Sequence, residues 1–137
     1  MPGLSFSVQI ELALRLLLAA GLGAVIGWQR EKWHKPAGLR THMLICIGAA
    51  LFTIVSINGF PGGVSSQVAA GVVTGIGFLG AGAIMHRGKS VEGLTTAASI
   101  WSVAAIGMAV GAGIYLLGLL TAIIVFVVLY IKYPRNE

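Results

Sequence analysis

The sequence predicts an all-α membrane protein, a polytopic bundle of about five transmembrane helices with its N-terminus outside and its C-terminus in the cytoplasm. Of its 137 residues, 57% are hydrophobic and 9% are charged, whereas a soluble domain carries about 25% charged residues. The mean hydropathy is +0.93. The basic residues lie in short clusters between long uncharged runs, which indicates a membrane protein and argues against a nucleic-acid partner.

The expected spans form a single transmembrane domain and cover residues 8–27, 41–57, 67–85, 94–110 and 114–131. At a rise of about 1.5 Å per residue, such segments cross most of a hydrocarbon core of about 30 Å. All four prolines lie outside them, so each can be a continuous helix. The loops at 28–40 and 86–93 and the C-terminal tail are basic, whereas 58–66 and 111–113 carry no charge. The positive-inside rule therefore gives the stated orientation.

Glycine is concentrated in the third span, which the rest of the bundle is expected to surround. In water, each helical glycine costs about 0.5–1 kcal/mol relative to alanine. In a bilayer, small residues spaced at i, i+4 let helix backbones approach each other closely. We therefore expect the third span to be the packing centre of the bundle. The candidate packing glycines are Gly23, Gly27, Gly71, Gly75, Gly77, Gly80, Gly82, Gly107 and Gly111.

Glu11 and Arg15 place two opposite charges inside the first span, at i, i+4 on one helix face. A charge at the centre of a span costs about 2.5–3.5 kcal/mol on insertion scales. Two interpretations stay open. Arg15 either lines an ion path or holds another helix, or it forms a self-contained pair with Glu11 and reaches the outer headgroups.

Hydroxyl side chains gather on the fourth span. Thr95, Ser99 and Ser102 follow each other at i, i+4 and i+7, with Thr96 beside them and Thr74 of the third span as a possible facing residue. They indicate either a polar seam for a solute or ordinary hydrogen bonds, between helices or to carbonyls of their own helix. The second interpretation is favoured. Trp101 lies near mid-span, where we expect it to be buried.

The sequence predicts no enzyme, metal site or cofactor. No serine or threonine has a histidine and an acid at the spacing of a catalytic set. His42 and Cys46 share a helix face, but two ligands are too few for zinc. The four glutamates are scattered and the chain has no aspartate, so a dedicated Mg²⁺ cage within one chain is not expected.

Four blocks of this chain resemble the MgtC/SapB family of bacterial membrane proteins. They are residues 23–31 (GAVIGWQRE), 38–42 (GLRTH), 75–82 (GIGFLGAG) and 93–101 (GLTTAASIW). They place Arg30, Glu31, Arg40, Thr41 and His42 in a family-motif loop. The resemblance implies a multi-span inner-membrane protein linked to growth under magnesium limitation. Members are often labelled Mg²⁺ transporters, and one branch regulates other membrane machines.

The chain departs from the family pattern in two places. Members often carry an acidic-proline-arginine block before the third helix, and residues 61–67 (PGGVSSQ) contain neither the acid nor the arginine. Longer members also have a soluble C-terminal domain. Because this chain stops at Glu137, regulation through such a domain is not expected.

The leading functional hypothesis is a non-enzymatic membrane protein of magnesium or ion homeostasis. It would sit in the lipid bilayer and act by helix–helix contact, as a homo-oligomer or with other membrane proteins, through its glycine faces. The alternative is a small transporter or channel, with Mg²⁺ as one possible ion substrate. In that case Arg15, Thr95, Ser99 and Ser102 would line the route.

Overall fold

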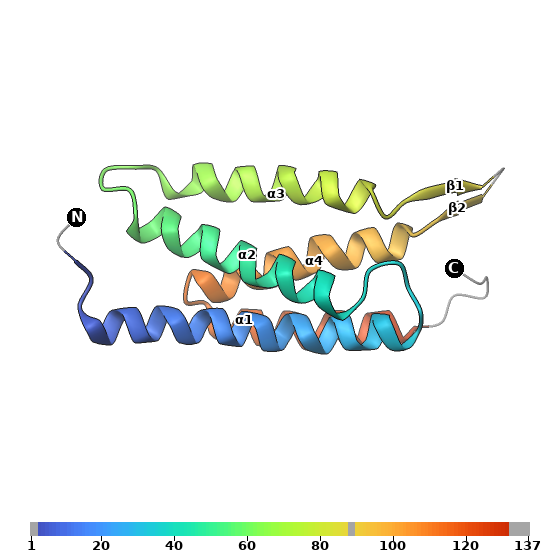
Figure 1. Cartoon of the computed structure of the whole chain (residues 1–137), viewed down its shortest axis with the longest axis horizontal. Helices are drawn as coiled ribbons and strands as arrows, with labels where there is room; N and C mark the ends of the chain where they lie inside the picture. Colours follow the sequence, from blue (N-terminus) through green and yellow to red (C-terminus); the bar gives the residue numbers. More distant parts are fainter. Residues whose placement is uncertain (1–2, 88–89, 132–137) are drawn as a thin grey trace.

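The computed structural model describes residues 3–87 and 90–131, and within them the prediction of five helices is confirmed (Figure 1). The elements are α1 (Phe6–Lys32), α2 (Leu39–Asn58), α3 (Ser65–Ala81), β1 (Met85–Arg87), β2 (Ser90–Glu92), α4 (Leu94–Gly111) and α5 (Tyr115–Tyr130). By length and composition, α1, α2 and α4 can cross a membrane. Helices α3 and α5 are also apolar but have 17 and 16 residues.

Helix α1 is longer than the sequence predicts. It begins after Ser5, whose side-chain oxygen accepts a hydrogen bond from the backbone N–H of Val8. It ends at Lys32 rather than at residue 27, because no proline or glycine interrupts the chain between Gly27 and Pro36. The expected loop at 28–40 is therefore much shorter, and all five family-motif residues lie on the ends of α1 and α2.

The third expected span is wrong at its C-terminal end. Helix α3 ends at Ala81 rather than at residue 85, and the expected loop at 86–93 contains an antiparallel hairpin in which Met85 pairs with Glu92. The tip of this hairpin, residues 88 and 89, lies outside the described residues. Gly93 follows with φ of +83°, a conformation that glycine adopts without steric cost, and it directs the chain into α4.

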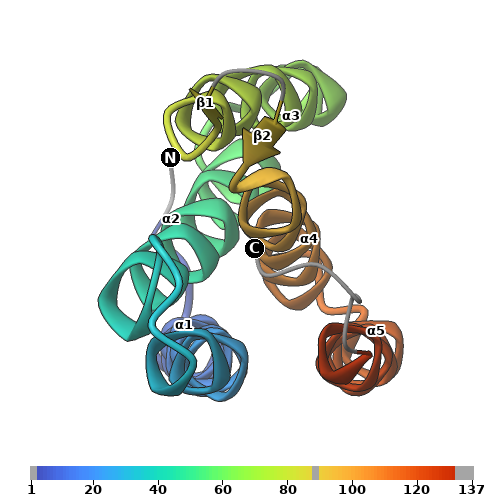
Figure 2. The same ribbon diagram turned by 90° about the vertical axis from the view of Figure 1, so that its right-hand side faces the viewer.

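Helices α1, α2 and α4, here called the central helices, pack most closely against one another. Figure 2 shows α2 and α4 in the middle, with α3 on one side of them and α1 and α5 on the other. Of its 17 residues, α3 contributes Val72 and Gly80 to the buried set. The expectation that the third span is the packing centre is therefore wrong within this chain. The central helices supply most of the buried apolar core, including Ala19, Leu22, Ile26, Ile45, Cys46, Ala49, Ala50, Ile100, Val103, Ala104, Ile106 and Val110.

Glycines bring the three central helices into backbone contact. A Cβ atom built on Gly23 would lie 2.8 Å from the carbonyl oxygen of His42, and one on Gly27 would lie 2.8 Å from Cα of Leu39. On another side of α2, Gly107 and Gly111 of α4 pack just as closely against the α2 backbone. Larger side chains at these positions would push the helices apart, as is usual where small residues line membrane helix contacts.

The two ends of the bundle differ in charge. The α1–α2 loop and the hairpin lie at one end, and the start of α1 and the α2–α3 connection lie at the other (Figure 1). The first end carries the basic residues Arg30, Lys32, Lys35 and Arg40. The α2–α3 connection, residues 59–64, carries no charge.

Candidate functional site

A buried polar cluster joins α1, α2 and α4 at the basic end of the bundle. Arg30, His42, Thr96 and Ser99 are all at most 2% exposed. The Arg30 Nη2 donates to Oγ1 of Thr96 at 3.0 Å. The Ser99 hydroxyl lies 2.9 Å from Nε2 of His42. The structure therefore brings two residues of the family motif together with two of the candidate intramembrane hydroxyls.

Both ring nitrogens of the buried His42 have hydrogen-bond partners within this part of the fold. Its Nδ1 lies 2.8 Å from the carbonyl oxygen of Gly38, and a carbonyl only accepts, so Nδ1 carries the proton. In the neutral ring Nε2 is then an acceptor for the Ser99 hydroxyl. The same hydroxyl lies 2.7 Å from the backbone oxygen of Thr96, so its proton has an acceptor in either orientation. Burial of these groups requires such partners.

The glycine contacts explain why the cluster forms at this level. Gly27 lets α1 approach the start of α2, and the positive φ of Gly93 starts α4 beside it. Arg30 lies three residues after Gly27, and Thr96 lies three residues after Gly93. Both side chains therefore lie where α1, α2 and α4 meet. The neighbouring Gln29 is also buried, and its Nε2 donates to the backbone oxygen of Phe126 on α5 at 3.2 Å. The sequence offered one signal for Gln29, an uncharged polar residue inside the block GWQRE.

A second polar cluster ties α1 to the α4–α5 turn, toward the other end. Arg15 donates to the hydroxyl of Tyr115 at 2.7 Å, to the carbonyl oxygen of Gly111 at 2.9 Å and to Oε1 of Glu11 at 2.9 Å. The Tyr115 hydroxyl donates to the same Glu11 oxygen at 3.1 Å. Arg15 is thus placed at the C-terminal end of α4, where the helix dipole favours a cation. The geometry combines parts of both interpretations of Arg15: its pair with Glu11 forms, but the pair is not self-contained, because Arg15 also holds the α4–α5 turn.

The remaining candidate hydroxyls do not form a seam. Thr74 is exposed and donates to Ala70 on its own helix, and Ser102 donates to Ala98 on its own helix. Thr95 is half-buried. Trp101 is 54% exposed, so the expectation that it is buried is wrong. Its ring lies beside an apolar pocket between α3 and α4, in a position that lipid would cover.

Apolar residues separate the two polar clusters. On α4, the buried residues between Ser99 and Gly111 are apolar or glycine. The facing part of α2, from Ile45 to Ala50, buries apolar residues and Cys46. On α1, the stretch between Arg15 and Gln29 likewise buries apolar residues and glycine. Within the part of the chain that the structure describes, the interior therefore offers no continuous polar route from one end to the other.

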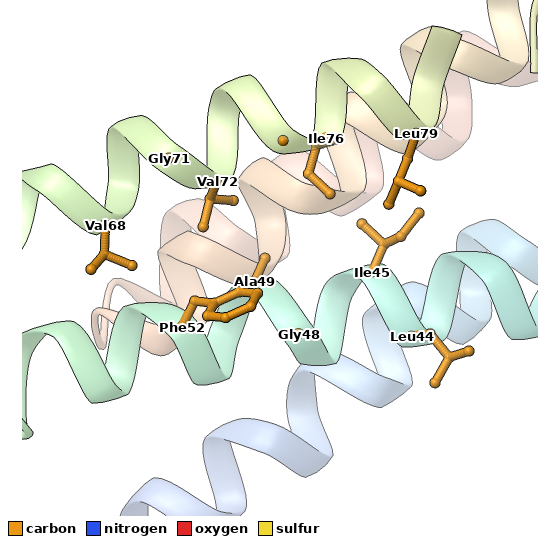
Figure 3. Close-up of a pocket in the computed structure, with 11 residues that line it drawn as sticks. Leu44, Ile45, Gly48, Ala49, Phe52, Val68, Gly71, Val72, Ile76 and Leu79 are labelled. Atoms are coloured by element: carbon orange, nitrogen blue, oxygen red, sulfur yellow. The ribbon is translucent and has the colours of Figure 1, made fainter. Parts of the chain in front are cut away.

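An open groove runs between α2 and α3, with a cavity volume of about 640 Å³. Figure 3 shows Val68, Val72, Ile76 and Leu79 pointing from α3 toward α2, and Ile45 pointing back. The groove walls consist of apolar side chains and glycine: Leu44, Ile45, Gly48, Ala49 and Phe52 on α2, and Val68, Gly71, Val72, Gly75, Ile76 and Leu79 on α3.

The glycines of α3 contact little of this chain. A Cβ atom on Gly71, Gly75 or Gly77 would meet nothing within 4 Å. Gly80 faces Ala97 of α4 at an ordinary contact distance of 3.5 Å, and Gly82 lies in the turn after the helix. The third helix therefore presents unfilled glycine surface, in contrast to the filled glycine contacts of α1 and α4.

A polar pocket lies at the basic end of the bundle, between the end of α1 and the start of α2. Its cavity volume is about 440 Å³. It contains the other motif residues, Glu31, Arg40 and Thr41, which are exposed. Its remaining walls are His34, Lys35, Pro36 and Gly38. Arg40 and Thr41 precede Leu44 and Ile45 of the groove by one helical turn, so the two pockets share one face of α2.

Comparison with known proteins gives consistent matches along most of the chain. A model described as the MgtC family matches residues 16–137. "Putative magnesium transporter YhiD" of Escherichia coli (strain K12) is 49% identical over 127 residues, covering 87% of this chain and 59% of that protein. Protein SrpB of Synechococcus elongatus is 44% identical, covering 81% and 69%. Protein MgtC of Salmonella typhimurium is 46% identical, covering 82% and 48%.

These relatives are longer proteins. The chain spans about half to two thirds of the length of the curated relatives that it matches. No solved structure matches.

Proposed function

Because the chain belongs to the MgtC family, whose model matches all but its first residues, we propose that it serves magnesium or ion homeostasis as a non-enzymatic membrane protein. It is a multi-pass protein of the bacterial inner membrane, as its relatives and its long apolar helices indicate. Its mode of action in this proposal is helix–helix contact, with a second copy or with another membrane protein.

We further propose that all five helices span the bilayer, with the basic end in the cytoplasm. The location of Arg30, Lys32, Lys35 and Arg40 at one end of the bundle supports this orientation (Figure 1). Helices α3 and α5, with 17 and 16 residues, are about 24–26 Å long at helical rise. A bilayer accommodates such short helices by local thinning at a modest cost.

The contact surface that the proposal assigns is the outer face of α3. Ala70, Thr74, Gly77 and Ala81 are exposed and follow each other at i, i+4, i+7 and i+11, so they form one stripe of small residues. Beside them, Phe78 is 83% exposed. Membrane helices associate through such stripes, because close backbone approach gains van der Waals contact. The observation that carries the proposal is that α3 is rich in small residues, few of which contact the other helices of this chain.

Transport is the competing function, and the name of the YhiD relative refers to it. Two features of this chain argue against a route through its interior. Arg15 is committed to Glu11, Gly111 and Tyr115, and the interior between the two polar clusters is apolar. A transported ion would need polar groups along that stretch to replace its water.

The test compares Gly77→Leu with Gly21→Leu in the full chain. Both glycines have open space where a side chain would go, so neither substitution is expected to disturb the fold. We expect Gly77→Leu to abolish the crosslinked complex in native membranes, whereas Gly21→Leu on α1 retains it. A complex that survives Gly77→Leu would rule out this contact face.

Flux measurements separate contact from transport. Purified protein in proteoliposomes is expected to show no Mg²⁺, K⁺ or proton flux above empty vesicles. Flux that disappears in Arg15→Ala, in a variant that still inserts and keeps its melting temperature, would instead establish transport and place Arg15 on the route.

A further inference from the structure

The groove between α2 and α3 is a defined cavity, and several glycines in its walls have empty space where a side chain would lie. A Cβ atom on Gly48, Gly71 or Gly75 would meet nothing within 4 Å. Its volume of about 640 Å³ lies within the range of about 300–1,000 Å³ that is common for small-ligand sites. Exposed Leu44, Phe52 and Leu79 at its rim show that it opens to the surroundings of the bundle.

The groove runs along the middle of both helices that form it. On α2 its lining extends from Leu44 to Phe52, about 12 Å at helical rise, and on α3 from Val68 to Leu79, about 16 Å. It therefore covers about half the depth of a hydrocarbon core of about 30 Å and crosses the middle of the bundle. It begins one turn after Arg40, at the basic end, so an acyl chain that follows it would start near headgroup level and reach the centre of the bilayer.

The polar pocket at the start of α2, one helical turn before the groove, has the chemistry of a phosphate site. Arg40 and Thr41 on α2 and Lys35 in the loop line it, together with His34 and one acid, Glu31. Arg40 is exposed, and the structure records no ion pair for it among the described residues. Basic pockets beside membrane helices on the cytoplasmic side bind anionic headgroups. The two pockets together thus match an amphipathic molecule with a negatively charged head.

We propose that this composite site binds one anionic phospholipid, with its phosphate at Arg40 and one acyl chain in the groove between α2 and α3. The site is independent of the proposed contact stripe, because Gly75 and Gly77 lie on opposite faces of α3.

The experiment is native mass spectrometry of the full-length, delipidated protein titrated with phosphatidylglycerol or phosphatidylethanolamine of the same acyl chains. We expect a one-to-one adduct that favours phosphatidylglycerol. Arg40→Gln should lower phosphatidylglycerol affinity about fivefold, the effect of about 1 kcal/mol for one cation near a headgroup. It should lower phosphatidylethanolamine affinity less, because the ammonium group of that lipid offsets the charge of its phosphate. Gly75→Leu should abolish both adducts, because its side chain fills the groove.

Gly77→Leu is the matched control, since it makes the same substitution on the same helix outside the groove. It should retain the lipid adduct, and all variants should keep the melting temperature of the parent protein. Equal binding of the two lipids, or no effect of Arg40→Gln, would overturn the headgroup assignment. Adducts that survive Gly75→Leu, or that are lost equally in Gly77→Leu, would overturn the groove.

Two further outcomes separate this proposal from the contact function. A dimer that Gly75→Leu splits into monomers would show that a second copy, not a lipid, fills the groove. Loss of the membrane complex in Gly77→Leu with the lipid adduct retained would support both proposals through different faces of α3. A complex that persists in Gly77→Leu refutes the contact stripe, and it does not affect the lipid proposal, which the adducts test separately.

Discussion

Replacing Ser99 with alanine is expected to destabilise the bundle by about 1–2 kcal/mol, through the loss of one buried hydroxyl. The hydroxyl lies 2.9 Å from Nε2 of His42 and 2.7 Å from the backbone oxygen of Thr96. His42 is 0% exposed, so no water replaces the lost partner. A buried group left unsatisfied costs about 1–3 kcal/mol in soluble proteins. Interhelical hydrogen bonds in membranes average about 0.6 and reach about 1.7 kcal/mol, which lowers the expectation.

Ser102 provides the matched control, because it lies on the same helix less than one turn further on. Its hydroxyl donates to the backbone oxygen of Ala98 on its own helix at 2.9 Å. That carbonyl also accepts the helical N–H bond, so Ser102→Ala is expected to change stability by less than about 0.5 kcal/mol. The assay is reversible unfolding by sodium dodecyl sulfate in mixed micelles, followed by circular dichroism. Equal effects of the two substitutions would refute the role given to the Ser99–His42 bond.

Two further predictions test the packing of the bundle. Gly107→Ala is expected to lower stability by about 1–3 kcal/mol, because its Cβ would overlap the Cys46 carbonyl and overpacking forces the helices apart. Gly21 has open space around it. Gly21→Ala should therefore be neutral or stabilising by up to about 1 kcal/mol in the same unfolding assay. Arg15→Met should lower the melting temperature more than Tyr115→Phe does, because it removes three hydrogen bonds at once. A melting temperature of Arg15→Met equal to that of the parent would show that the polar link from α1 to the α4–α5 turn adds nothing to stability.

The number of helices was predictable because charges, prolines and the Gly111–Gly113 turn divide the apolar runs. Their ends were less so, for a physical reason. Hydropathy reports where lipid ends, not where a helix ends. In α1, the helix runs on from Trp28 through Lys32 into the polar region, since nothing in that stretch breaks it. At the end of α3 the opposite holds, because the chain leaves the helix at Ala81 while it is still apolar.

Burial was the least predictable property. In a soluble protein an apolar side chain is expected inside, but lipid is as apolar as a protein core. Hydropathy therefore cannot distinguish Trp101, which is half exposed, from a core residue. The same limit applies to glycine spacing. The pairs Gly23–Gly27 and Gly71–Gly75 have identical spacing, yet the first contacts α2 and the second faces open space.

The buried polar cluster shows what could and could not be predicted about the site. Arg30, His42, Thr96 and Ser99 could each be singled out as polar residues near or within apolar segments. Their pairing could not, because the partners lie 66 and 57 positions apart in the chain and no spacing rule connects them. Tyr115 was missed altogether, since a tyrosine after a glycine turn has no signal that identifies it as the partner of an arginine on another helix.

The contrast between filled and open glycines also determines what each substitution on α3 can report. At Gly75 a leucine would occupy space that the chain leaves empty, so in the proposed site it replaces lipid atoms with protein atoms on the same face. Helix α3 then keeps its support against α2, and the stripe around Gly77 stays in place. We therefore expect Gly75→Leu to lose the lipid and retain the membrane complex. If the complex is lost as well, a second copy rather than a lipid fills the groove, and the lipid assignment is wrong.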